Sequence, residues 1–304
     1  MTSQLEAMLT PFAAISDHLA EQNKLLADVA SQLKTQTELA TKTHWEANKA
    51  RLTVESLKTI LGAALLSQVR AAIIPKQLGF METLDLIRDE ELSFARFGDG
   101  EFRMMTRLDF NVSFQKNSAR LQQGLKAAIQ GEGAPKLLVG MPNVFVDLHW
   151  TTVYHEVWDQ VEPMLDATDR FGNSHVSRPL MFQAFGQEAV EGWKSLWAGK
   201  NVAIVTGHGS RFDLEPALFD SVASTRFEYS MPRDAFNDIE DLSRRLADGK
   251  DDLVLISLGP AGTVLAHRLA QLGKRALDIG HLSSSYNNVI NGGAFPEHTP
   301  IARS

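Results

Sequence analysis

The sequence predicts an α/β fold, in which a mostly parallel sheet with flanking helices is preceded by a long N-terminal coiled-coil helix. Two observations predict it. Before Pro75, apolar residues recur in a heptad, which is typical of a coiled coil. After Pro75, short apolar runs rich in Val, Ile and Leu alternate with amphipathic stretches, which is typical of repeated βα units. We therefore divide the chain into a coiled-coil oligomerisation stem, residues 1–74, and an α/β domain, residues 75–304.

The stem holds large apolar residues in two heptad columns. They are Leu5, Met8, Phe12, Ile15, Leu19, Leu26, Val29 and Leu33. Gln22 and Gln36 take two further seam positions, and the same register continues through small residues in the middle and larger ones at the end: Ala40, Thr43, Ala47, Ala50, Val54, Leu57 and Leu61. Thr10 and Pro11 suit the start of a helix and Pro75 suits its end, so we expect one helix over about residues 11–73, ~95 Å long at ~1.5 Å per residue. We expect it to form a homodimer or homotrimer; the alternative is an amphipathic helix folded back on its own domain.

The α/β domain contains six apolar runs that we interpret as strands. They cover residues 93–97, 136–141, 202–206, 226–230, 253–258 and 275–279. Helical patterns between them cover residues 119–129, 144–157, 182–197, 235–247 and 263–272. Because strands this apolar are typically buried on both faces, we expect a parallel sheet with helices on each side and a ligand at the carboxyl ends of the strands. The tail after Asn287 is expected to be irregular.

Composition excludes several classes of function. The net charge of −7 gives no global attraction to nucleic acid, so we expect no nucleic-acid partner. The absence of cysteine excludes disulfides and thiolate ligands, so any metal must bind to carboxylates or histidines. The N-terminus shows no secretory pattern, and the most apolar stretch, residues 60–74, falls short of the ~20 apolar residues of a membrane span. We expect a cytoplasmic protein that reaches the inner membrane only through partners.

The first candidate site is the segment from Ala95 to Glu101, where an apolar run leads into a glycine-flanked turn. Asp99 and Glu101 could hold a hard divalent cation through oxygen, with water and substrate phosphates completing its coordination. Arg96 offers a planar donor fork for phosphate, and Gly98 leaves room for a ligand. An isolated pair of acids at this spacing is more often a solvent-exposed turn.

Two glycine turns form the second set. Gly259, Pro260, Ala261 and Gly262 follow an apolar run and precede a helical pattern, so they could present backbone N–H groups to an anion. Many such turns only reverse the chain. Gly207 begins a similar turn that resembles a dinucleotide fingerprint but has a phenylalanine in place of the third glycine.

Arg178 and His281 complete the candidates. Arg178 stands just before a helical pattern, where it could bind a substrate anion or form a structural ion pair. His281 follows the last apolar run and could bind metal, act in proton transfer or donate to a phosphate, although a histidine there is more often structural. The remaining histidines show no metal-ligand spacing. Four tryptophans are expected in the core rather than as sugar platforms: Trp150, Trp158, Trp193 and Trp197.

In their order and spacing these segments resemble the GT-D glycosyltransferase family over about residues 85–290. The matching pieces are ARFGDGE at 95–101, SRP at 177–179, the strand and glycine turn at 202–211, MPRDAF at 231–236, LGPAG at 258–262 and ALDIGH at 276–281. The resemblance implies a Rossmann-like domain that binds a nucleotide sugar, with UDP expected by analogy. It also implies a divalent ion, Mn²⁺ or Mg²⁺, at Asp99 and Glu101. Ala261 stands where a threonine is expected in closer relatives, and the loop at 208–211 also departs from the family pattern.

The resulting prediction is a metal-dependent glycosyltransferase that moves a sugar to a glycan, glycoprotein or lipid-linked acceptor in bacterial surface polysaccharide or glycoprotein assembly. Arg96, Arg178 and His281 are then candidate donors to the diphosphate or the sugar. Other glycosyltransferases are possible partners through the stem. Two alternatives stay open: a non-catalytic coiled-coil scaffold with a nucleotide-binding docking domain, and a dinucleotide- or S-adenosylmethionine-dependent α/β enzyme.

Overall fold

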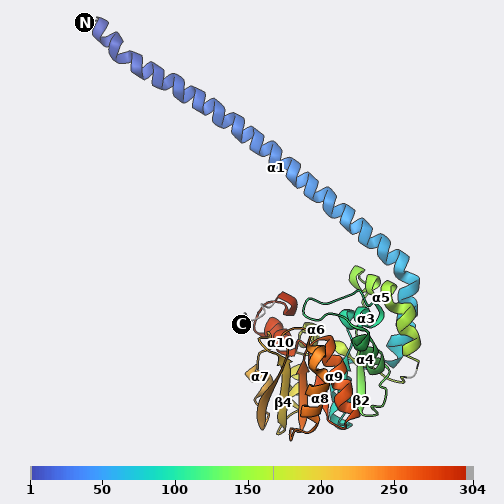
Figure 1. Ribbon diagram of the computed structural model, residues 1–304. Coiled ribbons are helices and arrows are strands. Elements are labelled where there is room, and N and C mark those ends of the chain that lie inside the picture. The colour runs from blue at the N-terminus through green and yellow to red at the C-terminus, as the bar shows by residue number, and fades with distance from the viewer. Residues whose placement is uncertain (1, 167, 299–304) are drawn as a thin grey trace. The chain divides into compact units, whose positions relative to one another are not determined.

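The computed structural model describes the backbone of residues 2–166 and 168–298, and side chains from residue 15 onward except that of residue 17. The chain divides into two compact units, residues 1–60 and residues 61–304. The first is a single helical segment, and the second contains a sheet with helices on both faces (Figure 1).

The long helix α1 runs from Thr2 to Ile73. Its end agrees with the predicted end, but the predicted start at Thr10 and Pro11 is wrong, because the helix continues through the proline. A proline removes one helical hydrogen bond, which does not by itself stop a helix of 72 residues. The side chains of Leu5, Met8 and Phe12 lie outside the described residues. The described large seam residues are all exposed: Ile15, Leu19, Leu26, Val29, Leu33, Val54, Leu57 and Leu61.

Part of α1 is apolar enough, by length and composition, to span a membrane. Between His18 and Lys76, an 18-residue window reaches a mean hydropathy of 1.5, which meets the length and composition of a membrane span. This finding differs from the expectation that the stem lacks a stretch of membrane-span composition. Leu66, Val69 and Ile73 are buried in the α/β core, but only 17% of the apolar window is buried, so packing against the core accounts for little of its apolar character.

The sheet has seven strands in the order β3-β2-β1-β7-β6-β4-β5, and all its pairings are parallel. The strands are β1 (Ser93–Arg96), β2 (Leu137–Met141), β3 (Gly172–Asn173), β4 (Asn201–Gly207), β5 (Ser224–Ser230), β6 (Leu253–Ser257) and β7 (Ala276–Asp278). All six predicted strands are confirmed, and β3 was not predicted. Burial on both faces is wrong for β5, which is an edge strand with mostly exposed side chains.

Helices cover both faces of the sheet. One face carries α3 (Asp99–Thr106), α4 (Ala119–Ile129), α5 (Leu148–Val161), α8 (Ile239–Ala247) and α9 (Pro260–Gln271). The other carries α2 (Phe80–Asp89), α6 (Pro179–Lys194), α7 (Pro216–Phe219) and α10 (Leu282–Ile290). The four tryptophans expected in the core are buried, which confirms that prediction.

Several predicted helix bounds need correction. The segment 235–247 is a 3-10 turn, Ala235–Asp238, followed by α8, and the chain after Asn287 stays helical to Ile290. The helices α2, α3 and α10 were not predicted. Because every strand is parallel, all their carboxyl ends meet at one edge, where the candidate residues gather.

Candidate active site

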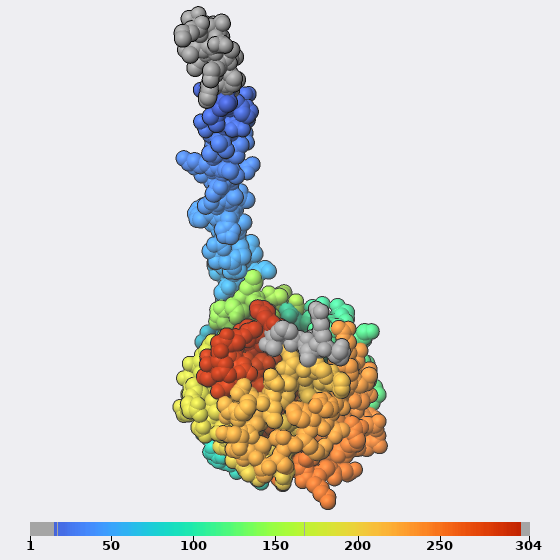
Figure 2. Space-filling view, turned by 90° about the vertical axis from the view of Figure 1, so that its left-hand side faces the viewer, coloured from blue at the N-terminus to red at the C-terminus, as the bar shows by residue number. Residues whose placement is uncertain are grey.

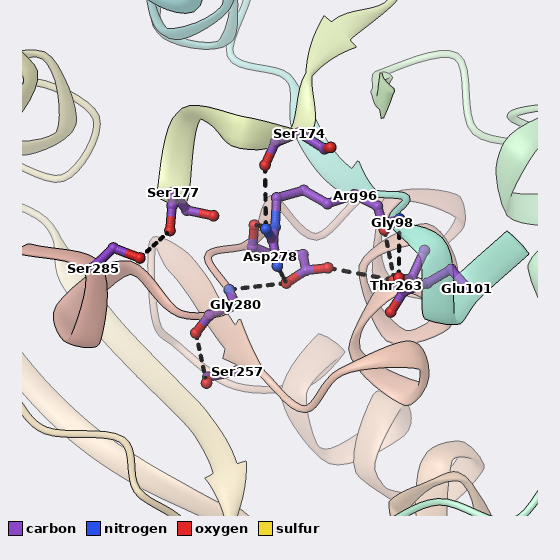
Figure 3. Close-up of polar contacts among 10 residues, drawn as sticks. All are labelled: Arg96, Gly98, Glu101, Ser174, Ser177, Ser257, Thr263, Asp278, Gly280 and Ser285. Carbon is purple, nitrogen blue, oxygen red and sulfur yellow. Dashed lines mark hydrogen bonds and ion pairs between the residues drawn. The ribbon is translucent and has the colours of Figure 1, made fainter. Parts of the chain in front are cut away.

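Arg96 joins three strand ends at the centre of this edge (Figure 3). It lies at the end of β1, and its guanidinium donates to the Asp278 carbonyl at 3.0 Å, to Oδ1 of Asp278 at 3.3 Å and to the Ser174 carbonyl at 3.2 Å. Thr263 of α9 donates to the Arg96 carbonyl at 2.9 Å. Asp278 is buried, which raises its pKa, while the charge of Arg96 opposes the shift. The pair therefore ties β1, β3 and β7 together where the site lies.

Gly280 follows β7 and lies against this arginine. Its φ is +46°, and a Cβ atom at this position would stand 1.7 Å from Nη2 of Arg96. Its N–H donates to Oδ1 of Asp278 at 3.1 Å. Glycine is therefore required here both by the backbone conformation and by the close approach of the guanidinium.

Asp99 and Glu101 occupy the first turn of α3 instead of an open turn. Gly98 caps the helix, and its N–H donates to Oε2 of Glu101 at 2.9 Å. Burial raises the pKa of Glu101 to about 7; its backbone hydrogen bond and Arg96 lower it, and the nearby Asp278 and Asp99 raise it further. The Glu101 carboxyl therefore takes up a proton much more readily than an exposed glutamate does.

Asp99 lies on the more exposed side of the same turn. Its Oδ2 is 3.4 Å from Nε2 of His149 and 3.7 Å from Nη1 of Arg103. Residues two apart on a helix do not face each other, so the two carboxylates point in different directions. Within the described part of the chain, no group of three or more His, Asp or Glu side chains forms a ready metal cage.

Arg178 and His281 are brought together, as the sequence predicts for a shared site. Arg178 is the residue before α6, and His281 is the residue before α10. Burial lowers the pKa of His281 to about 4, with further lowering by Arg178, Arg96 and Arg211. Burial also lowers the pKa of His175 to about 3, again with Arg178 and Arg96 contributing. We call Arg96, Arg178, Arg211, His175 and His281 the cationic cluster. Arg96 and Arg178 lower the pKa of both histidines, and Arg211 lowers the pKa of His281.

The glycine turns lie on the neighbouring strands of the same edge, and Arg211 of the cationic cluster stands at the end of the turn that follows β4. The expectation of several open N–H groups in the LGPAG turn needs correction. The helix α9 already begins at Pro260, which has no N–H, and the Gly262 N–H donates to the Gly259 carbonyl at 2.7 Å. Two N–H groups of the turn remain without a described hydrogen bond: that of Gly259, which is partly exposed, and that of Ala261, which is fully buried.

The turn after Gly207 does not form a dinucleotide site. A dinucleotide fingerprint needs a helix that begins directly after the glycines. Here no described helix begins until α7, at Pro216, and α7 has only four residues. This alternative therefore has no structural support.

Sequence reasoning did not single out Asp278, Ser174, His175 or Arg211. Asp278 stands inside the ALDIGH piece, and a carboxylate at the end of an otherwise apolar strand was the available signal. Ser174 and His175 lie in a short 3-10 helix after β3, and Arg211 lies in the loop after β4, so their spatial neighbours are set only by the sheet order.

Comparisons with known proteins agree with this architecture. A model of the "Glycosyltransferase GT-D fold" family matches residues 94–293. Glycosyltransferase GlyD of Streptococcus pneumoniae serotype 4 is 31% identical over 222 residues, which is 68% of this chain and 27% of that protein. The Probable glycosyl transferase Gly of Streptococcus gordonii is 28% identical over 224 residues, which is 69% of this chain and 32% of that protein. The chain thus spans about a third or less of these relatives' lengths.

Solved structures show the same fold. A structure described as the highly conserved domain of unknown function 1792, with a distinct glycosyltransferase fold, has a TM-score of 0.66 and 27% identity, covering 77% of this chain and 87% of that one. A new glycosyltransferase of that domain type from Streptococcus sanguinis has a TM-score of 0.64 and 27% identity, with 72% and 85% covered. This chain therefore belongs to the GT-D glycosyltransferase family, and its α/β unit is a glycosyltransferase domain.

Proposed function

We propose that the α/β unit transfers a sugar from a nucleoside diphosphate sugar, UDP by family analogy, to a glycan, glycoprotein or lipid-linked acceptor. The observation that carries this proposal is the cationic cluster at the carboxyl edge of the sheet. Three arginine charges converge there from the ends of β1 and α6 and from the loop after β4. A diphosphate leaving group has the matching negative charge and fits a guanidinium fork.

The cluster suits the charge that develops during the transfer. When the bond between the sugar and the diphosphate breaks, negative charge grows on the departing phosphate, and preorganised arginines stabilise it. His281 and His175 have lowered pKa values, so at neutral pH each can form a hydrogen bond without adding a charge that would repel the arginines. Asp278 holds Arg96 in place by an ion pair instead of leaving it mobile.

A divalent cation fits the residues of the first turn of α3, with Asp99 as the principal ligand. Its side chain is 44% exposed, and His149 lies beside it. The Glu101 carboxylate points away from Asp99, so it would favour the cation mainly through its charge once the cation favours the ionised form. Because the described residues offer no closed cage, the other ligands would be substrate phosphates and water, as is usual for Mg²⁺. A bound cation supplies neutralisation of the diphosphate charge.

We further propose that the stem assembles copies of this chain through its exposed heptad seam. Several active sites on one assembly would engage a repeating acceptor, or a partner transferase, by avidity. The exposed apolar seam residues of α1 support this arrangement.

The test of the function is calorimetric titration of the full chain with UDP, with and without Mn²⁺. Asp99→Asn should remove the metal-dependent part of binding, weakening UDP in Mn²⁺ by about tenfold or more, because an amide is a poor ligand for a hard cation. Glu101→Gln should act in the same direction while keeping the hydrogen bond from Gly98.

The matched control is Asp109→Asn, an exposed acid paired with Arg107 in the loop after α3. It should leave UDP affinity unchanged. If Asp99→Asn and Glu101→Gln are folded and bind UDP with Mn²⁺ as tightly as the original chain, the assignment of this turn is wrong. If the original chain does not bind UDP at all, UDP is not the nucleotide of the donor.

A further inference from the structure

The C-terminal arm, residues 294–298, lies on the cationic cluster. Glu297 forms an ion pair with Arg178, and the ring of Phe295 packs over the same guanidinium at 5.9 Å from the ring centroid. Arg211 donates through Nη1 to the carbonyl of Pro296 at 3.0 Å. In the space-filling view the red C-terminal part of the chain lies on the surface of the α/β unit, over the yellow and orange elements (Figure 2).

Two of the three arginines of the cluster are thus engaged by one short segment. The segment begins just after the range matched by the family model, which ends at residue 293. Glu297 and Phe295 stay exposed over nearly half of their surfaces, whereas Pro296 between them is buried.

We propose that this arm is an internal plug, in which the Glu297 carboxylate occupies the place of a donor phosphate oxygen on Arg178, so that the nucleotide sugar binds only when the arm leaves. The inference rests on the proposed function, because it takes the cationic cluster as the diphosphate site. A carboxylate and a phosphate present the same charge and acceptor geometry to a guanidinium, so the two compete for the same donors.

The strength of the contacts suits a plug that a substrate can displace. Burial alone would raise the pKa of Glu297, but the charge and hydrogen bond of Arg178 lower it overall, so the carboxylate is ionised at neutral pH. An ion pair at this exposure contributes little net stability, and the ring of Phe295 over Arg178 adds a modest amount. A tightly bound diphosphate that competes for the same arginines can therefore displace the Glu297 carboxylate.

The test compares UDP affinity by calorimetry, in the presence of Mn²⁺, for the full chain and for Glu297→Gln. Apparent affinity scales with the fraction of open protein, so removal of the plug's charge should tighten UDP binding roughly three- to tenfold. A chain that ends at Gly293 should bind at least as tightly as Glu297→Gln. The matched control is Glu90→Gln, which removes another exposed arginine pair, with Arg170, at the opposite edge of the sheet and should leave UDP affinity unchanged.

A second readout follows the arm itself. The chain has no cysteine, so an Ala294→Cys variant carries one environment-sensitive label at the base of the arm. UDP with Mn²⁺ should change its fluorescence at the concentrations that saturate the calorimetric signal.

Three results would overturn the plug. Equal UDP affinity of Glu297→Gln and the full chain means that the arm does not compete, and weaker binding means that Glu297 belongs to the donor site. A label that does not respond to saturating UDP means that the arm stays in place. All three results leave the proposed function intact, because UDP still binds. If no variant binds UDP, the shortened chain included, the assignment of the cationic cluster as the diphosphate site is wrong.

Discussion

At the scale of single residues, Arg96 shows how the site is built. The sequence indicates a free donor for phosphate, but three of its N–H groups are committed to Asp278 and Ser174. Its carboxylate partner lies 182 positions further along the chain, and no local pattern gives a partner at that separation. The apolar run before Arg96 predicts that this residue lies at the carboxyl edge of the sheet. No pattern in the sequence predicts the hydrogen bonds that it forms there.

His281 gives a pH prediction at the same scale. Its pKa is lowered from 6.5 to about 4 by burial, Arg178, Arg96 and Arg211. The folded protein therefore binds fewer protons than the unfolded chain between these values. With respect to His281, the unfolding free energy is therefore highest above pH 6.5. It falls by up to about 3 kcal/mol as the pH is lowered toward 4.

Replacement of His281 by a residue that does not titrate tests this pH dependence. His281→Asn should flatten the dependence of the unfolding free energy on pH between 6.5 and 4, measured by urea denaturation, while part of the slope remains because His175 titrates in the same direction. The same change at the exposed His155 serves as the control. An unchanged slope in His281→Asn would show that the imidazole is not desolvated in the folded state.

At the scale of elements, long or strongly apolar segments were predictable and short ones were not. The helix α4 agrees with its predicted range because its apolar spacing is regular and Ser118 caps it through Leu121 N–H. The helix α3 looked like a turn because it begins with glycines and acids. Its signal was the glutamate three residues after Gly98, which accepts from the Gly98 N–H and so supplies one half of a capping box. The strand β3 has two residues and leaves no pattern at all.

The packing of α4 on α9 depends on a missing side chain. A Cβ atom at Gly124 would stand 2.9 Å from Cγ1 of Val264. In an unhindered helix, Gly→Ala stabilises by about 1 kcal/mol. Gly124→Ala should therefore destabilise the chain despite its helix propensity, whereas in a Val264→Ala background it should stabilise by about 1 kcal/mol. Chemical denaturation of the four proteins gives this cycle, and additive effects would show that the two helices do not meet at this point.

At the scale of the whole molecule, the division into stem and domain follows from the change of sequence period, but the compact α/β unit starts at Leu61, before Pro75. The reason is that Leu66, Val69 and Ile73 continue the helix while packing into the domain's core. Periodicity reports the secondary structure of a segment and does not report which neighbour buries its apolar side. A shortened chain should accordingly begin at residue 61, since removal of residues 1–73 would also remove core side chains.

The stem prediction can be tested with neighbouring leucines of equal chemistry. Leu26 and Leu33 are 65% and 57% exposed and lie on the seam, whereas Leu25 and Leu39 are 59% and 64% exposed and lie beside it. Each large apolar side chain moved out of water contributes roughly 1.5–3 kcal/mol, so a self-associated stem should depend on the seam pair much more than on the flanking pair.

Sedimentation of the full chain at micromolar concentration should show a dimer or trimer. The double variant Leu26→Gln, Leu33→Gln should shift it toward monomer, while Leu25→Gln, Leu39→Gln should retain the assembly, and residues 61–304 alone should sediment as a monomer that still binds UDP. Equal loss of assembly in both double variants would mean that general apolar contact, rather than the heptad seam, holds the copies together. A full chain that is already monomeric would mean that the stem does not self-associate and that its exposed apolar residues are left for a different partner.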